Sequence, residues 1–345
     1  MPPESEFIER RRQKPWWQRT LREMAIHDFG VFAFLLALNA AVLATPDSAE
    51  RSFCLIRTGG LFFAFVLSIL LVRGRLLKRS WVAALVYRIG IYGVVQVSYF
   101  FLKHVLPLVN TITLDQKLYE LDLWLFHYEP AMAWDRYVTP ATTDWFAFFY
   151  FGYFLLLSVH VIPLVFFGRQ KQIVGEFTFG ILLMFSIGHS LYLLVPGYGP
   201  YRAMADAFQH PFPDGIWYRM TMDAVRSSGA LMDIFPSLHT GAPTVLALFS
   251  YRNRKHMPYR YTWPIVTFCT ANIIIATMFL RWHYLIDVVA GFSIAVSLVL
   301  LSRPIVRWEL ARRRREGLGD LWPEFSNAPL SGSGSKDLAD GVAAA

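Results

Sequence analysis

The stretch "RWHYLIDVVAGFSIAVSLVLLS", residues 281–302, decides the fold class of this chain. From Tyr284 to Ser302 it holds one charged residue, Asp287, in a run of mostly apolar side chains. A bilayer core of about 30 Å requires a helix of about 20 mostly apolar residues. The stretch therefore predicts a membrane-spanning helix that begins beside a histidine, His283.

The remainder of the 345-residue chain has the same character. It is 55% hydrophobic, and only 17% of its residues are charged, against about 25% in a typical soluble domain. The apolar residues form eight runs, which predict an all-α polytopic membrane protein with spans near 29–44, 54–72, 82–102, 145–167, 173–195, 240–251, 262–280 and 284–302. The sixth run is short, and it spans only if its helix begins within "FPSLH" or its ends lie in a protein-lined cavity.

Composition shifts divide the chain into four expected regions. These are a basic N-terminal segment at 1–28, two accessory spans within 29–81, a six-helix membrane core at 82–303, and a basic segment with a disordered Ser/Gly/Ala-rich tail at 304–345. The segment 113–137 has apolar residues at helical spacing but too many charges to span. It predicts either an amphipathic helix on the outer membrane surface or a loop helix packed on protein.

Basic residues cluster in alternate connections between the predicted spans, as in "RGRLLKR" (73–79) and "RNRKHMPYR" (252–260). Positive charge in short loops marks the cytoplasmic side. We therefore expect both termini in the cytoplasm, and His239 and His283 on the periplasmic, extracellular or lumenal side. The net charge of +8 is explained by anionic lipid at the cytoplasmic face, and no nucleic acid is required.

His283 and Asp287 are four residues apart, so they lie one turn apart on a helix. A carboxylate in this position orients an imidazole and leaves its second nitrogen free to act as a nucleophile. A structural hydrogen bond explains the same spacing.

His239 stands in "FPSLHTG", where Pro236 and Ser237 are typical of a helix start. The first turn of a helix binds phosphate, and a histidine beside that phosphate protonates a leaving oxygen. The alternative is a histidine that only completes the helix cap.

Two arginines are expected on the same side, Arg202 in "GPYR" and Arg281 two residues before His283. A guanidinium group matches phosphate oxygens bidentately, although either arginine could instead be an interfacial residue whose charge reaches the headgroups. His189, inside the fifth apolar run, predicts a helix–helix hydrogen bond or, as the alternative, a functional site.

The motifs "FPSLHTG" (235–241) and "RWHYLIDVVAG" (281–291) resemble the second and third motifs of the type 2 phosphatidic acid phosphatase superfamily, a set of helical membrane enzymes. The leucine in "PSLH" is similar to the branch that contains fungal inositol phosphorylceramide synthase. The resemblance implies that His283 is a nucleophile forming a phosphohistidine, that Asp287 orients it, that His239 is the general acid, and that Ser237 helps to bind phosphate.

The chain also departs from the family pattern. The first family motif is absent, and Arg202 is the candidate for its arginine. The third motif normally has an arginine six residues before the histidine, where this chain has Thr277, and Arg281 lies two residues before it.

The leading interpretation is an integral membrane lipid phosphotransferase that uses a phospholipid or lipid phosphate and an alcohol or sugar acceptor, without cofactor or metal. With water as acceptor it is a lipid phosphate phosphatase. Two other classes remain open, a hydrolase with zinc bound to His239, His283 and Asp287, and a transporter or lipid-binding protein on the same scaffold.

Overall fold

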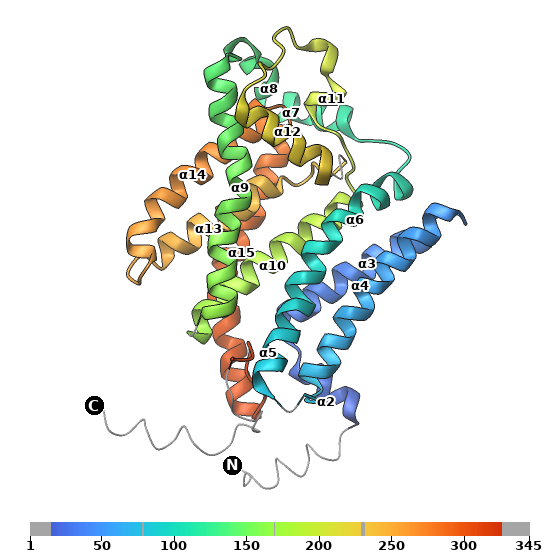
Figure 1. The fold of residues 1–345 in the computed structure, drawn as a ribbon, viewed down its shortest axis with the longest axis vertical. Coiled ribbons are helices and arrows are strands. Elements are labelled where there is room, and N and C mark those ends of the chain that lie inside the picture. Colours follow the sequence, from blue (N-terminus) through green and yellow to red (C-terminus); the bar gives the residue numbers. More distant parts are fainter. Residues whose placement is uncertain (1–14, 78, 169, 229–231, 326–345) are drawn as a thin grey trace.

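The computed structural model describes residues 15–77, 79–168, 170–228 and 232–325, and these residues are mostly helical (Figure 1). Those ranges contain no β-strand, and an isolated bridge joins Gly197 to Asp233. The all-α prediction is thus confirmed. The first part of the basic N-terminal segment and the predicted disordered tail at 326–345 lie outside the described residues.

Seven helical stretches in the described part of the chain are long and apolar enough to cross a membrane. They are α3 (Ile26–Leu43), α4 (Ala49–Arg73), the continuous run of α5 (Ser80–Arg88), η1 (Ile89–Gly93) and α6 (Val94–Val109), α9 (Pro140–Phe167), α10 (Lys171–Tyr192), α14 (Tyr259–Phe279) and α15 (Leu285–Glu316). Each corresponds to one predicted span. The bounds differ by up to seven residues, except that α15 continues 14 residues beyond the predicted end at 302.

The sixth predicted span, 240–251, is shorter than the others. It forms α13 (Leu238–Arg252), which has 15 residues and begins inside "FPSLH", so its length is about 22 Å at 1.5 Å per residue. Most of its residues are buried, and it packs against α10, α14 and α15. Protein contacts therefore replace lipid around this helix, which is how a helix too short to span is accommodated at membrane depth.

The remaining helices gather at the two ends of the molecule (Figure 1). At one end lie α7 (Asp115–Phe126), α8 (Pro130–Trp134), η2 (Asp135–Tyr137), α11 (Pro200–Ala203), η3 (Ala205–Ala207) and α12 (Ile216–Ser228); at the other lie α2 (Trp16–Glu23) and the end of α15. In α7, the buried residues Asp115, Leu118 and Asp122 lie along one face, and the helix contacts α15. The segment is therefore a loop helix packed on protein, while its placement at the membrane surface stays a prediction.

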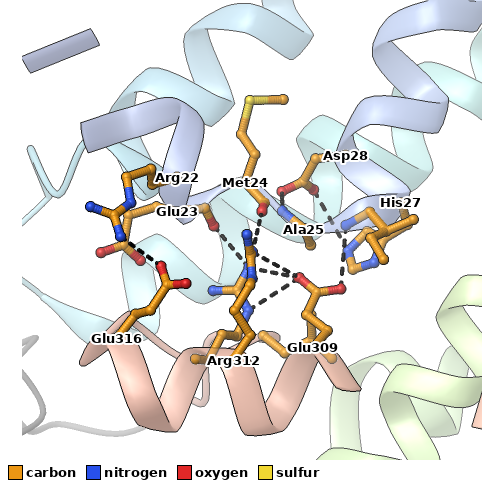
Figure 2. A network of polar contacts seen from close by, with 12 residues as sticks. Arg22, Glu23, Met24, Ala25, His27, Asp28, Glu309, Arg312 and Glu316 are labelled. Atoms are coloured by element: carbon orange, nitrogen blue, oxygen red, sulfur yellow. Dashed lines mark hydrogen bonds and ion pairs between the residues drawn. The ribbon is translucent and has the colours of Figure 1, made fainter. Parts of the chain in front are cut away.

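A network of charged side chains joins the accessory helices to α15 at the end opposite α7 and α8 (Figure 2). Arg22 on α2 pairs with Glu316 on α15 at 2.9 Å, and the amide of Ile26 donates to Glu309 at 3.4 Å. The buried carboxylate of Asp28 pairs with Arg73 on α4 at 3.0 Å. Because α15 continues past the predicted core boundary at residue 303, its last turns are available to anchor these helices.

At the other end of α15 the backbone comes very close to the start of α13. A Cβ atom at Gly291 would lie 2.3 Å from the carbonyl oxygen of Ser237. A Cβ at Gly241 would lie 3.2 Å from the carbonyl oxygen of Gly291. The two helices approach this closely only because glycine stands at the contact, and the amide of Ser237 then donates to the carbonyl of Asp287 at 3.0 Å.

The Gly291→Ala variant tests this contact. We expect it to lower the free energy of unfolding by about 1–3 kcal/mol, the usual cost of overpacking, because the obstructing atom belongs to the backbone. Thermal unfolding of the purified protein in detergent measures the change. The control is Gly152→Ala on α9, where an added Cβ meets nothing within 4 Å, and which should be neutral or slightly stabilising. Equal melting temperatures for both variants would contradict the close-contact account.

Candidate active site

The first turn of α13 places His239 in an aromatic environment. Ser237 is the N-cap, and its hydroxyl oxygen accepts from the amide of Thr240 at 3.2 Å, as predicted for a helix start. The His239 ring stacks on Tyr150 with centroids 4.4 Å apart and lies 4.2 Å from the ring of Tyr153, both on α9. Nε2 of His239 is buried without a hydrogen-bond partner among the described residues. The ring is therefore held by packing, and its nitrogen remains available.

The corner between α14 and α15 presents the second histidine. The amide of Arg281 donates to Met278, and the amide of Trp282 donates to Thr277, each at 2.9 Å, with Arg281 at φ 66°. This pattern is a Schellman motif, which ends a helix through one left-handed residue. The chain then turns sharply enough for His283 to precede α15, and its side chain is buried.

His283 and Asp287 lie close together, as predicted from their spacing. The distance from Nδ1 of His283 to Oδ2 of Asp287 is 3.5 Å, too long for a good hydrogen bond. The same carboxylate oxygen accepts from the amide of Tyr284 at 2.9 Å, and this bond caps α15. Asp287 therefore does two things in this structure, since it fixes the helix start and places a carboxyl group beside the imidazole.

Burial lowers the pKa of His283 to about 4, against the opposing effects of the Asp233 charge and a hydrogen bond to the Ile234 backbone. The imidazole is consequently neutral near pH 7. A neutral ring retains a nitrogen lone pair, which a nucleophile or base requires.

Two carboxylates that the sequence analysis did not select also hold this corner. Asp122 on α7 accepts from the amides of Leu285 and Ile286, each at 2.7 Å. Burial raises the pKa of Asp122 to about 6. Because these amides and that of Tyr284 are already bonded, the first turn of α15 does not offer them to a phosphate. No local sequence signal identified Asp122, since an acid-rich loop contains many equivalent carboxylates.

Asp115 is the second of these two carboxylates. Its carboxylate accepts from the amides of Tyr198 and Gly199 at 2.8–3.1 Å and from the Tyr284 hydroxyl at 3.3 Å. The loop after α10 is thereby fixed against the α14–α15 corner. Gly199 has φ 84°, and a Cβ there would lie 2.3 Å from the Trp282 carbonyl oxygen, so this glycine is needed for the contact.

The two histidines meet at one cavity. Their ring centroids are 6.4 Å apart, although 44 residues separate them in the sequence. The cavity has a volume of about 230 Å³, and His189, Asp233 and Trp282 also line it. Its wall contains six tyrosines, which are Tyr99, Tyr150, Tyr153, Tyr192, Tyr198 and Tyr201. No lysine or arginine is among the lining residues, all of which lie in the described part of the chain.

Arg281 is engaged away from this cavity. Its guanidinium donates to Asp135 and to the carbonyl of His210, each at 2.6 Å. It is sandwiched between the rings of Phe208 and Phe212, at 3.9 and 4.2 Å from their centroids. The side chain thus fastens the loop after α11 to the α14–α15 corner, and its predicted contact with substrate stays a prediction.

Arg202 and Ser237 are also outside the cavity lining. The Arg202 side chain is exposed and lies 3.8 Å above the ring of Tyr198, which does line the cavity. Ser237 is fully buried as the N-cap of α13. Their roles in substrate binding remain predictions. The zinc alternative gains no support, because the described residues contain no group of three His, Cys, Asp or Glu side chains placed to hold a metal ion.

The contacts of Arg281 suggest a test of whether this residue stabilises the fold or binds the phosphate of a substrate. Arg281→Lys keeps the charge but loses the planar fork and the ring packing. We expect it to lower the free energy of unfolding by about 1.5–3 kcal/mol, as for a hydrogen bond to a charged group, and Asp135→Asn to cause a similar loss. In the double variant the losses should not add, because the two residues interact directly. Unchanged stability in both single variants, with activity lost only for Arg281→Lys, would favour substrate binding.

Comparison with known proteins agrees with the two motifs. No curated protein and no solved structure matches the chain at a significant level. A profile of the PAP2 superfamily matches residues 116–301, more than half of the chain, and the match includes both histidines and all of the cavity wall except Gln96 and Tyr99. Members of this superfamily are phosphatases and phosphotransferases. The chain is therefore a membrane protein of the PAP2 superfamily.

Proposed function

We propose that this protein is an integral membrane phosphotransferase that moves a phosphate-containing headgroup between a membrane lipid and an alcohol acceptor. The observation that carries the proposal is the cavity that His239 and His283 share, 6.4 Å apart between ring centroids. One histidine is neutral and beside a carboxylate, and the other is held between aromatic rings. This pair supplies a nucleophile and a proton donor for phosphoryl transfer.

The charge of the cavity favours a phosphodiester donor over a phosphomonoester. A monoester carries close to two negative charges at neutral pH, whereas a diester carries one. The lining includes one carboxylate, Asp233, and neither lysine nor arginine. Positive potential comes instead from the first-turn amides of α13. Burial lowers the pKa of His239 to about 3, so the proposal requires the bound anion to favour the protonated form of this histidine. A singly charged diester is the better match for this limited counter-charge, and it makes the donor a phospholipid with a headgroup.

The proposed reaction has two steps. In the first, Nε2 of His283 attacks phosphorus, the bond from phosphorus to the lipid oxygen breaks, and His239 donates a proton to that oxygen. In the second, His239 takes the proton of the acceptor hydroxyl, whose oxygen attacks phosphorus and breaks the bond to His283. Neither step requires a metal or a cofactor, so we expect full activity in the presence of a chelator.

Transfer to an alcohol instead of water depends on how well the cavity excludes water. Its wall is rich in aromatic rings, and α12 contributes Thr221, Ala224 and Val225 to one side. Together with the leucine in "PSLH", this supports a transferase similar to the inositol phosphorylceramide synthase branch, with a sugar alcohol as one possible acceptor. Water as acceptor, which gives a lipid phosphatase, is the alternative.

The phosphoenzyme is the direct test. Wild-type protein incubated with phosphatidylinositol radiolabelled at phosphorus should become labelled through a bond that is stable in alkali and labile in acid. His283→Ala should abolish labelling. His239→Ala should slow transfer from the lipid by about 10²–10⁴-fold, the usual contribution of a general acid, but much less from a nitrophenyl phosphodiester, whose leaving group needs no proton.

The control is His104→Ala, an exposed histidine outside the cavity lining, which should label normally. Labelled protein from His283→Ala would refute the nucleophile assignment. Equal losses with both donors would refute the acid assignment for His239. Faster turnover of phosphatidic acid than of phosphatidylinositol, with water as acceptor, would favour the phosphatase.

We also propose that the site faces the non-cytoplasmic side, with both termini in the cytoplasm. Basic clusters support this orientation. The α2 helix and the C-terminal end of α15 lie at the end of the molecule opposite α7, α8 and α12 (Figure 1). The start of α13 and the corner before α15 lie near those three helices, because α7 caps α15 and α12 helps to line the cavity.

Cysteine labelling tests the orientation. The two native cysteines, Cys54 and Cys269, are replaced by alanine, and a single cysteine is introduced at Asp214 or at Lys255, both exposed. An impermeant maleimide applied to intact cells should react at position 214 and not at 255. Both positions should react after permeabilisation. The reverse pattern in intact cells would invert the topology.

A further inference from the structure

A second polar position lies in the same cavity, on a different wall. His189, near the C-terminal end of α10, lines the cavity together with Gln96 and Tyr99 of α6. Its ring stacks on Tyr99 with centroids 5.9 Å apart and lies 5.5 Å from the ring of Phe34 on α3. The helices α6 and α10 run past each other in Figure 1 and are in contact.

The His189 side chain is buried without an internal partner. The residue is 1% exposed, and neither Nδ1 nor Nε2 has a hydrogen-bond partner among the described residues. The helix–helix hydrogen bond predicted from the sequence is therefore not formed there. Burying such a group unsatisfied costs about 1–3 kcal/mol, and a phenylalanine would fill the same space without this cost. A histidine that faces a cavity in this state is suited to a ligand.

The chemistry of the position defines that ligand. A neutral imidazole offers one N–H donor and one acceptor nitrogen. Gln96 and Tyr192 line the same cavity, and each has an uncharged side-chain group that donates and accepts hydrogen bonds. With no lysine or arginine in the lining, this wall matches a neutral hydroxyl or amide better than a second anion.

We propose that His189, with Gln96 and Tyr192, forms a binding subsite for a neutral hydroxyl-bearing group of a substrate. This inference rests on the proposed function, in which the phosphate lies between His239 and His283. The hydroxyl belongs either to the alcohol acceptor or to the lipid backbone, since both have the same hydrogen-bonding chemistry. In either case His189 contacts substrate away from the reacting phosphorus and contributes to affinity.

The test uses His189→Phe, which keeps the ring packing and removes both nitrogens. The matched control is His160→Phe on α9, because that imidazole donates to its own helix at Leu156 and does not line the cavity. We expect His189→Phe to raise the KM for one substrate by about 5- to 100-fold, as for two neutral hydrogen bonds, with kcat changed much less. A raised KM for myo-inositol assigns the subsite to the acceptor, and a raised KM for the lipid donor assigns it to the lipid.

A binding measurement separates this inference from the proposed function. In a His283→Ala background, which cannot turn over, myo-inositol or a short-chain diacylglycerol should raise the melting temperature, and adding His189→Phe should abolish that shift. This readout holds even if the wild-type protein transfers no phosphate at all. If His189→Phe folds poorly, His189→Gln, which keeps a donor and an acceptor, should retain part of the shift. The subsite would be refuted if His189→Phe left the KM for both substrates unchanged from wild type. The thermal shifts of the His283→Ala protein would then also be the same with and without His189→Phe.

Discussion

The close approach of α13 and α15 is the contact on which the site depends. The backbone of Ser237 bonds to the carbonyl of Asp287, and Gly291 leaves room for the Ser237 carbonyl oxygen. His239 is the second residue of α13, and His283 lies two residues before the first residue of α15. Joining the two helix starts therefore joins His239 and His283. A short α13 is compatible with this arrangement, because its position is set by protein contacts on several sides and not by the membrane thickness.

Acidic side chains between residues 115 and 135 hold together the helices and loops that lie beside this contact. Asp122 bonds the first amides of α15, Asp115 holds the Tyr198–Gly199 turn, and Asp135 pairs with Arg281. Each carboxylate satisfies backbone amides or a guanidinium that would otherwise be buried without partners, which is costly. The acid-rich loop thus contributes to the structure of the protein. Arg281, which has a left-handed backbone conformation, connects the segment that contains Asp135 to the segment that contains His210.

The cavity beside these helix starts combines two histidines with a lining that includes one carboxylate and neither lysine nor arginine. Burial lowers the pKa of His283 to about 4, which favours the neutral ring that the proposed nucleophile requires, and His239 packs against two tyrosine rings. In the proposed reaction, helix amides and a histidine protonated in the presence of the anion would stabilise the phosphate more than basic side chains would. That balance is the physical basis for proposing a singly charged donor, and it leaves the polar wall at His189 free to recognise a neutral group.

The sequence by itself determined the membrane-spanning helices, the helix start at Ser237 and the two histidine motifs, because apolar runs and capping residues act over a few neighbouring positions. It also placed Asp287 one turn from His283. The partners of Arg281, the carboxylates that cap α15 and the unpartnered state of His189 were decided only by the tertiary structure. Arg281 and Asp135 are 146 residues apart, and an arginine beside a catalytic motif looks the same in sequence whether it binds phosphate or fastens a loop. The distinction depends on which backbones approach one another, and that follows from glycine contacts and buried hydrogen bonds between distant segments.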